Sequence, residues 1–239
     1  MRERKRRLSA AIFVIVSLLS GLLYEAIQER PTEQPQTLGV VSKAEQPPSE
    51  NALQALEKLE VKGRAPKTGY DRSKFSNGWG EIDNCSVREL ILLRDLKDTK
   101  LDEDGCRVLT GRLDPDPYSG KVIDFQRGIN TSQAVQIDHV VAVSDAWQKG
   151  AQQLTPELRN QFYNDPLNLL AVDGPTNNDK GDGDAATWLP PNKEYRCRYV
   201  ARQIAVKIKY SLWLADAEGR AMRSILSACP DQVLPIVGN

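Results

Sequence analysis

The sequence has little histidine, no net charge and no zinc-type cysteine pair. His139 is the only histidine in 239 residues. Lysine and arginine together number 32, as do aspartate and glutamate, so no overall charge excess favours a polyanionic partner. No two cysteines are spaced as C-x2-C, which argues against a zinc site made of the four thiolates. Any nucleic-acid site must therefore be local.

The N-terminal segment is typical of an exported protein. A basic stretch, MRERKRR, precedes an uncharged and mostly apolar run from Leu8 to Tyr24. This run is longer than most signal-peptide cores, about 7–15 residues, and shorter than a spanning helix, about 20 residues. No clear A-x-A cleavage site follows it. Residues 1–27 are therefore predicted to be a signal peptide or a retained membrane anchor, with the rest of the chain secreted or on the outer face of the membrane.

Residues 28–62 are predicted to be a linker. Their first half is polar and proline-rich, with few large apolar groups to bury. Further on, Leu53, Leu56 and Leu59 recur at helical spacing, which favours a short packing or linker helix over an active element. Residues 63–239 then form one domain, which 40% hydrophobic content is enough to fold.

Four cysteines lie in this predicted domain. An even number of cysteines in an exported chain indicates disulfides, and four cysteines allow three pairings. We favour Cys85 with Cys106 and Cys197 with Cys229, because each pair brackets one compact block of predicted structure and closes a short loop.

The residue pattern of the domain predicts an α+β fold. Ser86 followed by Glu89 is a capping-box signature at the start of a helix, SVRELILLRDLK. RVLTGRL and KVIDFQ flank the turn sequence DPDPYSG and predict a β-hairpin. TPELRNQFYN begins with Thr155 as N-cap and Pro156 at the first helical position. NKEYRCRYVARQIAVKIKYSLWL and DAEGRAMRSILSAC predict two final helices.

Three short segments carry the most informative residues. AVQIDHVVAV predicts a strand that contains the lone histidine, and NLLAV predicts a second strand opened by Asn168. DGPTNNDK predicts a helix with Asp173 as its cap and Asn177 within it. Neighbouring residues on a regular strand point to opposite faces, so Asp138 and His139 can serve one phosphate only if their strand bends or ends there.

Asp138-His139, then Asn168, then Asn177-x-x-Lys180, in the order strand, strand, helix, resemble the HNH motif of ββα-metal nucleases. The strings QIDHVVAVSDAWQKGA and NDPLNLLAVDGPTNNDKGDGDAATWLPPNKEYRCRYVARQ are similar to the exported HNH endonuclease family of bacteria, which is related to the C-terminal domain of GmrSD restriction enzymes. The resemblance covers roughly two thirds of the chain, the cysteines included. It implies a disulfide-braced domain containing a ββα-metal finger, export, metal-dependent nuclease activity, and products with 5′-phosphate and 3′-hydroxyl ends.

Each residue of the motif has a chemistry that phosphodiester hydrolysis needs. His139, with an unperturbed pKa of about 6.5, is suited to deprotonate the attacking water. The Asp138 carboxylate and the Asn177 amide oxygen suit a hard divalent metal, Mg²⁺ or else Mn²⁺, better than Zn²⁺. The resemblance gives Asn168 the role of holding the two strands and orienting the base. Lys180, one helical turn beyond Asn177, is expected to meet a phosphate as a point charge.

Charged residues outside the motif have alternative roles. Asp145 is either a partner of the site or a residue that satisfies the start of a helix. Asp179, Asp182 and Asp184 do not form an EF-hand because the glutamate at the twelfth position is missing, and we expect them to cap turns. The basic residues of 193–223 form either a solvated helix face or a phosphate-binding one.

We therefore expect an HNH endonuclease that hydrolyses DNA outside the cytoplasm, with RNA left open as a second substrate. Little sequence specificity is expected, because no recognition-helix or zinc-finger signature accompanies the motif. One alternative is a non-catalytic module that binds nucleic acid or an envelope polymer on the same scaffold; a second is a phosphodiesterase for smaller substrates. The intact motif, with the sole histidine in it, argues against the first. No protein partner is predicted.

Overall fold

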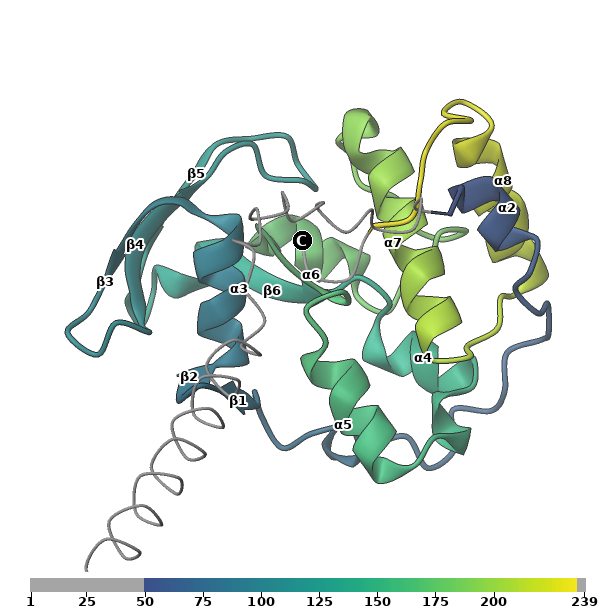
Figure 1. Cartoon of the computed structure of the whole chain (residues 1–239), viewed down its shortest axis with the longest axis horizontal. Helices are drawn as coiled ribbons and strands as arrows, with labels where there is room; N and C mark the ends of the chain where they lie inside the picture. The colour runs from purple at the N-terminus through teal and green to yellow at the C-terminus, as the bar shows by residue number, and fades with distance from the viewer. Residues whose placement is uncertain (1–49, 236–239) are drawn as a thin grey trace, which may run out of the picture. The chain divides into compact units, whose positions relative to one another are not determined.

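The computed structural model describes residues 50–235, and they form the expected mixture of helices and short strands (Figure 1). Their helices of five or more residues are α2 (Ala52–Leu56), α3 (Val87–Asp95), α4 (Val143–Gln148), α5 (Pro156–Asn164), α6 (Gly174–Lys180), α7 (Arg196–Lys209) and α8 (Asp216–Leu226). The signal peptide or anchor expected at 1–27 lies outside the described residues. Among the described helices, none is long and apolar enough to cross a membrane.

Three small antiparallel sheets accompany these helices. The strands are β1 (Glu81–Ile82) with β2 (Cys85–Ser86); β3 (Lys97–Leu101), β4 (Val108–Leu113) and β5 (Ile123–Gln126); and β6 (Val135–His139) with β7 (Leu169–Asp173). The predicted hairpin of β4 and β5 is confirmed. The sequence did not reveal β3, because KDTKL is short and almost wholly polar, without the apolar alternation that marks a half-buried strand.

The order strand, strand, helix around the lone histidine is confirmed. β6 and β7 pair from Val135 opposite Asp173 to His139 opposite Leu169, and α6 follows β7 directly and packs on both strands. The Asp173 carboxylate accepts from the backbone N–H of Thr176 at 3.0 Å and so caps α6 as predicted. β6 ends at His139, as the proposed site requires.

A glycine opens α6 because the chain is crowded there. A Cβ at Gly174 would lie 2.0 Å from the carbonyl oxygen of Gln133. Only glycine, which has no Cβ, avoids this clash. The first turn of α6 therefore lies directly against the segment that leads into β6.

The helix predicted after Ser86 is present as α3, but its capping box does not form. The Ser86 side chain makes no cap hydrogen bond. Glu89 instead accepts from the backbone N–H of Val108 at 2.9 Å and from the Arg127 guanidinium at 2.5 Å. Hydrogen bonds between charged partners are the stronger ones, so Glu89 fastens α3 to the three-stranded sheet and does not cap its own helix.

Both expected disulfides are present. Cys85 is bonded to Cys106, which ties β2 to the loop before β4, and Cys197 is bonded to Cys229, which ties the first turn of α7 to the segment after α8. Because all four cysteines are used in this way, a zinc site made of their thiolates is excluded.

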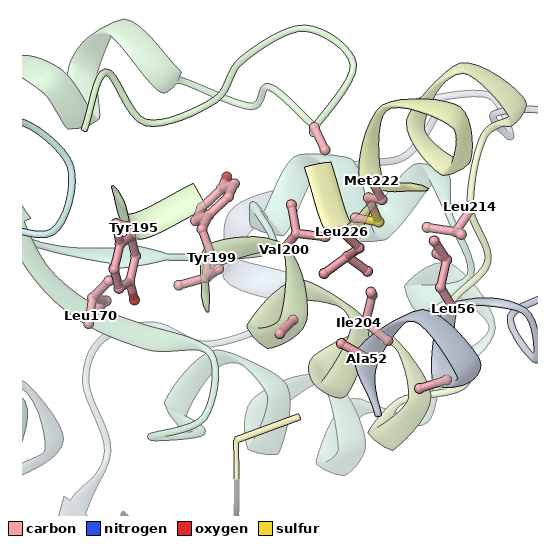
Figure 2. Packing of buried hydrophobic residues seen from close by; sticks show 14 of the residues in the cluster. Ala52, Leu56, Leu170, Tyr195, Tyr199, Val200, Ile204, Leu214, Met222 and Leu226 are labelled. Carbon is pink, nitrogen blue, oxygen red and sulfur yellow. The ribbon is translucent and has the colours of Figure 1, made fainter. Parts of the chain in front are cut away.

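The largest buried cluster surrounds α7. Figure 2 shows Ile204 of this helix among side chains of α2 and α8, including Ala52 and Met222. Ala52, Ala55 and Leu56 are buried, and Asn51 caps α2 while its backbone pairs with Val233. The short helix expected in the linker therefore exists, but it belongs to the core, so the packed domain includes residues before the boundary predicted at 63.

Candidate active site

A pocket of about 340 Å³ lies where β6 ends, α4 begins and α6 ends. Its walls include Asp138, His139 and Asn177, which come from β6 and α6. Asp138 and His139 contact different neighbours, as alternation along a strand requires, yet both reach the pocket because the strand stops there. The structure thus brings three of the five motif residues to one cavity.

The imidazole of His139 is held in one orientation. Its Nε2 lies 2.8 Å from the carbonyl oxygen of Tyr163, and since a carbonyl only accepts, Nε2 carries the hydrogen. The ring lies nearly parallel to Trp79, with 5.7 Å between centroids, and 4.5 Å from the ring of Tyr163. Within residues 50–235 no protein group hydrogen-bonds Nδ1. The remaining nitrogen is therefore an unshared acceptor on a pocket-lining residue.

The surroundings of His139 keep its ring neutral. Burial and the nearby positive charge of Arg72 lower the pKa of His139 to about 3, against the smaller opposing effect of the Tyr163 carbonyl. At neutral pH the imidazole is unprotonated, so Nδ1 can accept a proton without first releasing one.

Both oxygens of Asp138 are engaged. Oδ1 accepts from the Lys180 ammonium at 2.9 Å, and Oδ2 accepts from the hydroxyl of the buried Tyr118 at 2.5 Å. Burial raises the pKa of Asp138. The charge of Lys180 and the hydrogen bond from the Tyr118 hydroxyl oppose this rise. A carboxylate has about four lone-pair sites, so two hydrogen bonds leave room for a further ligand.

Lys180 does not lie as expected. Its side chain is 0% exposed, and its ammonium donates to Asp138 and to the backbone carbonyl of His139, each at 2.9 Å. An ammonium buried with two oxygen partners has no free face for a substrate phosphate. The structure therefore gives Lys180 the task of holding the Asp138-His139 pair from α6.

Asn177 lines the pocket, and one end of its amide is hydrogen-bonded. Its Nδ2 donates to Oε1 of Gln136 at 2.9 Å, and Gln136 in turn donates to Gln133. This chain fixes which end of the Asn177 amide faces β6. No described residue donates to its Oδ1, which is free to bind a cation or water.

Asn168 is completely buried and does not touch the pocket. Its Oδ1 accepts from the backbone N–H of Val141 at 2.8 Å, its Nδ2 donates to the Val141 carbonyl at 3.3 Å, and its own carbonyl accepts from Val140. These bonds fasten the start of β7 to the two residues after His139. This geometry fits the positioning role expected of Asn168.

Two arginines clamp the turn that carries Asn168. Arg202 of α7 donates to the carbonyl oxygens of Pro166, Leu167 and Leu169 at 2.7–2.9 Å, and Arg94 of α3 donates to two of them. The Arg202 guanidinium is thus engaged in hydrogen bonds within the protein. Most other basic side chains of 193–223 are also occupied: Arg196 by a backbone carbonyl, and Lys207, Lys209, Arg220 and Arg223 by carboxylates. Lys193 and Arg198 make no ion pair within residues 50–235, so the phosphate-binding face considered for this stretch stays a prediction.

A buried ionic cluster lies behind the pocket. Lys149 contacts the carboxylates of Asp145, Asp184 and Glu218 at 2.6–2.7 Å, and Lys207 contacts Glu218 at 3.0 Å. Asp145 is thus a member of this cluster and not a helix cap. Asp184 also pairs with a guanidinium, that of Arg64, at 2.6 Å. The cluster ties α4, α7 and α8 to the loop after α6.

Several residues of the site have no signature in the sequence. Arg72 and Tyr70 line the pocket from a segment whose sequence is only loop-like. Trp79 and Tyr163 enclose His139, and Tyr118 binds Asp138 from the hairpin turn. Isolated aromatic and basic residues far from the motif give no signal, because only the tertiary fold brings them to it.

The comparisons with known proteins identify the family of the chain. Residues 87–225, more than half of the chain, match the family described as GmrSD restriction endonucleases, C-terminal domain. The chain belongs to this family. A protein of the fungus Arthroderma benhamiae, called an uncharacterized secreted protein, is 35% identical over 185 residues, which cover 77% of this chain and 87% of the fungal one. The GmrSD relationship expected from the motif is confirmed, while the bacterial source remains an expectation because this relative is fungal.

The donors at the pocket suit a hard cation. Within residues 50–235 no three His, Cys, Asp or Glu side chains cluster as a zinc-type site would. Among the pocket's oxygen donors, the Asp182 carboxylate is bound by Lys67 and Ser144, which leaves the Asp138 carboxylate, whose charge Lys180 balances, and the unpaired amide oxygen of Asn177. Two oxygen ligands beside open space fit an ion such as Mg²⁺, which keeps several of its waters.

Proposed function

We propose that this member of the GmrSD C-terminal family is a metal-dependent HNH endonuclease that hydrolyses phosphodiester bonds in DNA. The observation that carries the proposal is the unpaired Nδ1 of a neutral His139, in one pocket with oxygen ligands from Asp138 and Asn177. In this reading β6, β7 and α6 are the ββα-metal finger.

His139 acts as the general base. Nδ1 removes a proton from the water that attacks phosphorus, and the Tyr163 carbonyl stabilises the resulting imidazolium through its bond to Nε2–H. A pKa of about 3 is low for a base working near neutrality. An arriving phosphate anion offsets the positive charge of Arg72 and raises this pKa toward the working pH.

Asp138 and Asn177 hold the divalent cation, Mg²⁺ or Mn²⁺. When bound, the cation neutralises charge on the phosphate and on the leaving oxygen. Lys180 and Tyr118 fix the Asp138 carboxylate from two sides, and Asn168 fixes the turn after the base. The products carry 5′-phosphate and 3′-hydroxyl ends, as the HNH resemblance implies.

We also propose that the enzyme works outside the cytoplasm. Two disulfides fit an oxidising compartment, and the fungal relative bears the name of a secreted protein. The segment 1–27 would serve as the signal peptide or, if retained, as an anchor.

The test is incubation of the oxidised protein with supercoiled plasmid and Mg²⁺ or Mn²⁺, with and without EDTA, alongside His139→Ala. We expect nicked and linear DNA only with metal and only from the wild-type protein. Cleavage that persists in EDTA or in His139→Ala would overturn the mechanism. Plasmid binding without cleavage under either metal would favour the non-catalytic module, and hydrolysis of nucleotides alone would favour the phosphodiesterase for small substrates.

A further inference from the structure

A 3-10 turn at Arg72–Lys74 lies outside the family match and is firmly anchored. Asp71 caps it by accepting from the Ser73 N–H at 2.8 Å. Phe75, which follows the turn, is buried against Trp147 and Phe162, with ring centroids 6.2 and 5.8 Å away. The position of this turn is therefore set by the core.

The Arg72 side chain extends from this turn toward Tyr163, the residue whose carbonyl also binds the proposed base His139. Its guanidinium lies 5.1 Å from the centroid of the Tyr163 ring, and its Nε donates to the Tyr163 hydroxyl at 3.4 Å. The backbone carbonyl of the same tyrosine accepts from His139. Arg72 and His139 are thus positioned from one residue on α5, and both line the pocket.

A substrate phosphate in this pocket needs a positively charged side chain as its partner, and Arg72 is available for that role. Among residues 50–235 no other lysine or arginine lines it. The nearby Lys180 is fully buried against Asp138. Arg72 is exposed, and none of the ion pairs within residues 50–235 includes it. Asp182, the other pocket carboxylate, pairs with Lys67 and Ser144.

We infer that Arg72 binds a non-bridging oxygen of the scissile phosphate and stabilises the charge that develops there during attack. The planar guanidinium matches the geometry of phosphate oxygens and never loses its charge. This inference rests on the proposed nuclease function and extends it: the segment before the family's matched region completes the active site.

The test compares Arg72→Ala and Arg72→Lys with the wild-type enzyme, using full-length oxidised protein, duplex DNA and saturating Mg²⁺. A contact made in the transition state lowers kcat, whereas binding of flanking phosphates only raises KM. We expect Arg72→Ala to lower kcat by about 100-fold or more, with KM little changed, and Arg72→Lys to recover part of the loss. Lys74→Ala is the matched control, because it removes the same charge from the same turn outside the pocket.

A second measurement separates contact from packing, since Arg72 also touches Tyr163. Added guanidinium ion at millimolar concentration should restore part of the activity of Arg72→Ala. Three outcomes would each overturn the assignment: an unchanged kcat in Arg72→Ala, an equal loss of kcat in Lys74→Ala, or a loss of kcat that guanidinium does not rescue. In each of these cases, DNA cleavage by the wild-type protein would still support the nuclease function. Wild-type protein that cleaves no DNA would overturn both.

Discussion

Removing the negative charge of Asp184 should destabilise the domain in a pH-dependent manner. The carboxylate is 3% exposed and contacts the Lys149 ammonium at 2.7 Å and the Arg64 guanidinium at 2.6 Å. Although burial opposes it, these cations and the backbone N–H of Ala186 hold the pKa of Asp184 at about 2, below its usual 3.8. A lowered pKa means that the folded state binds this proton less readily than the unfolded state.

The size of the effect follows from this shift. A difference of about 1.8 pKa units corresponds to about 2.4 kcal/mol of stability at pH 7. This contribution is complete above the unfolded pKa and declines as pH falls toward the folded one, to about 1.3 kcal/mol at pH 3. Leaving Lys149 without one of its carboxylates adds to the loss, and breaking buried ion pairs costs about 3–5 kcal/mol in total.

Urea denaturation followed by tryptophan fluorescence, on wild type and Asp184→Asn at pH 7, 5 and 3, measures this difference. We expect a loss of at least about 2.4 kcal/mol at pH 7 that narrows at pH 3. Asp179→Asn is the control, because Asp179 is exposed on the same loop side of α6 and should change stability by less than about 0.5 kcal/mol. A loss no larger than the control, or one independent of pH, would refute the reasoning.

Three further outcomes are expected. Asn168→Ala removes both side-chain bonds to Val141, so kcat for DNA should fall although Asn168 does not line the pocket; full activity in a steady-state assay would contradict its positioning role. Asn177→Ala should raise the Mg²⁺ concentration needed for half-maximal cleavage, and an unchanged metal titration would remove Asn177 from the ligand set. Replacing Cys197 and Cys229 by alanine opens a loop of sequence separation 32 and should cost about 3.7 kcal/mol in urea denaturation, with a loss below about 1 kcal/mol counting against it.

Local signals in the sequence were enough to place the motif. Thr155 and Asp173 cap their helices as predicted, because capping depends on residues three positions apart. The two disulfides, the hairpin and the order of β6, β7 and α6 follow from equally local patterns. The resemblance to the HNH motif, in turn, predicted that Asp138, His139 and Asn177 meet, and all three line one pocket.

What the sequence missed depends on contacts between distant segments. Glu89 has the spacing of a capping residue, but Arg127, far along the chain, binds it more strongly. Lys180 has the spacing of a phosphate ligand, but packing of α6 on β6 turns it to Asp138. Arg72 lies in a segment without any pattern and is recognisable only once Tyr163 is seen beside both it and His139.

Backbone hydrogen bonds join the two ends of the described chain. The backbone N–H of Ala52 donates to the carbonyl of Gln232 at 2.8 Å, and that of Leu234 donates to the carbonyl of Glu50 at 2.9 Å. Since α2 covers the core around α7 and pairs with residues 232–234, this core can close only after the chain up to about residue 234 has left the ribosome. For the exported nuclease proposed above, a chain threaded outward unfolded would therefore stay inactive toward the cell's own DNA until residue 234 has emerged.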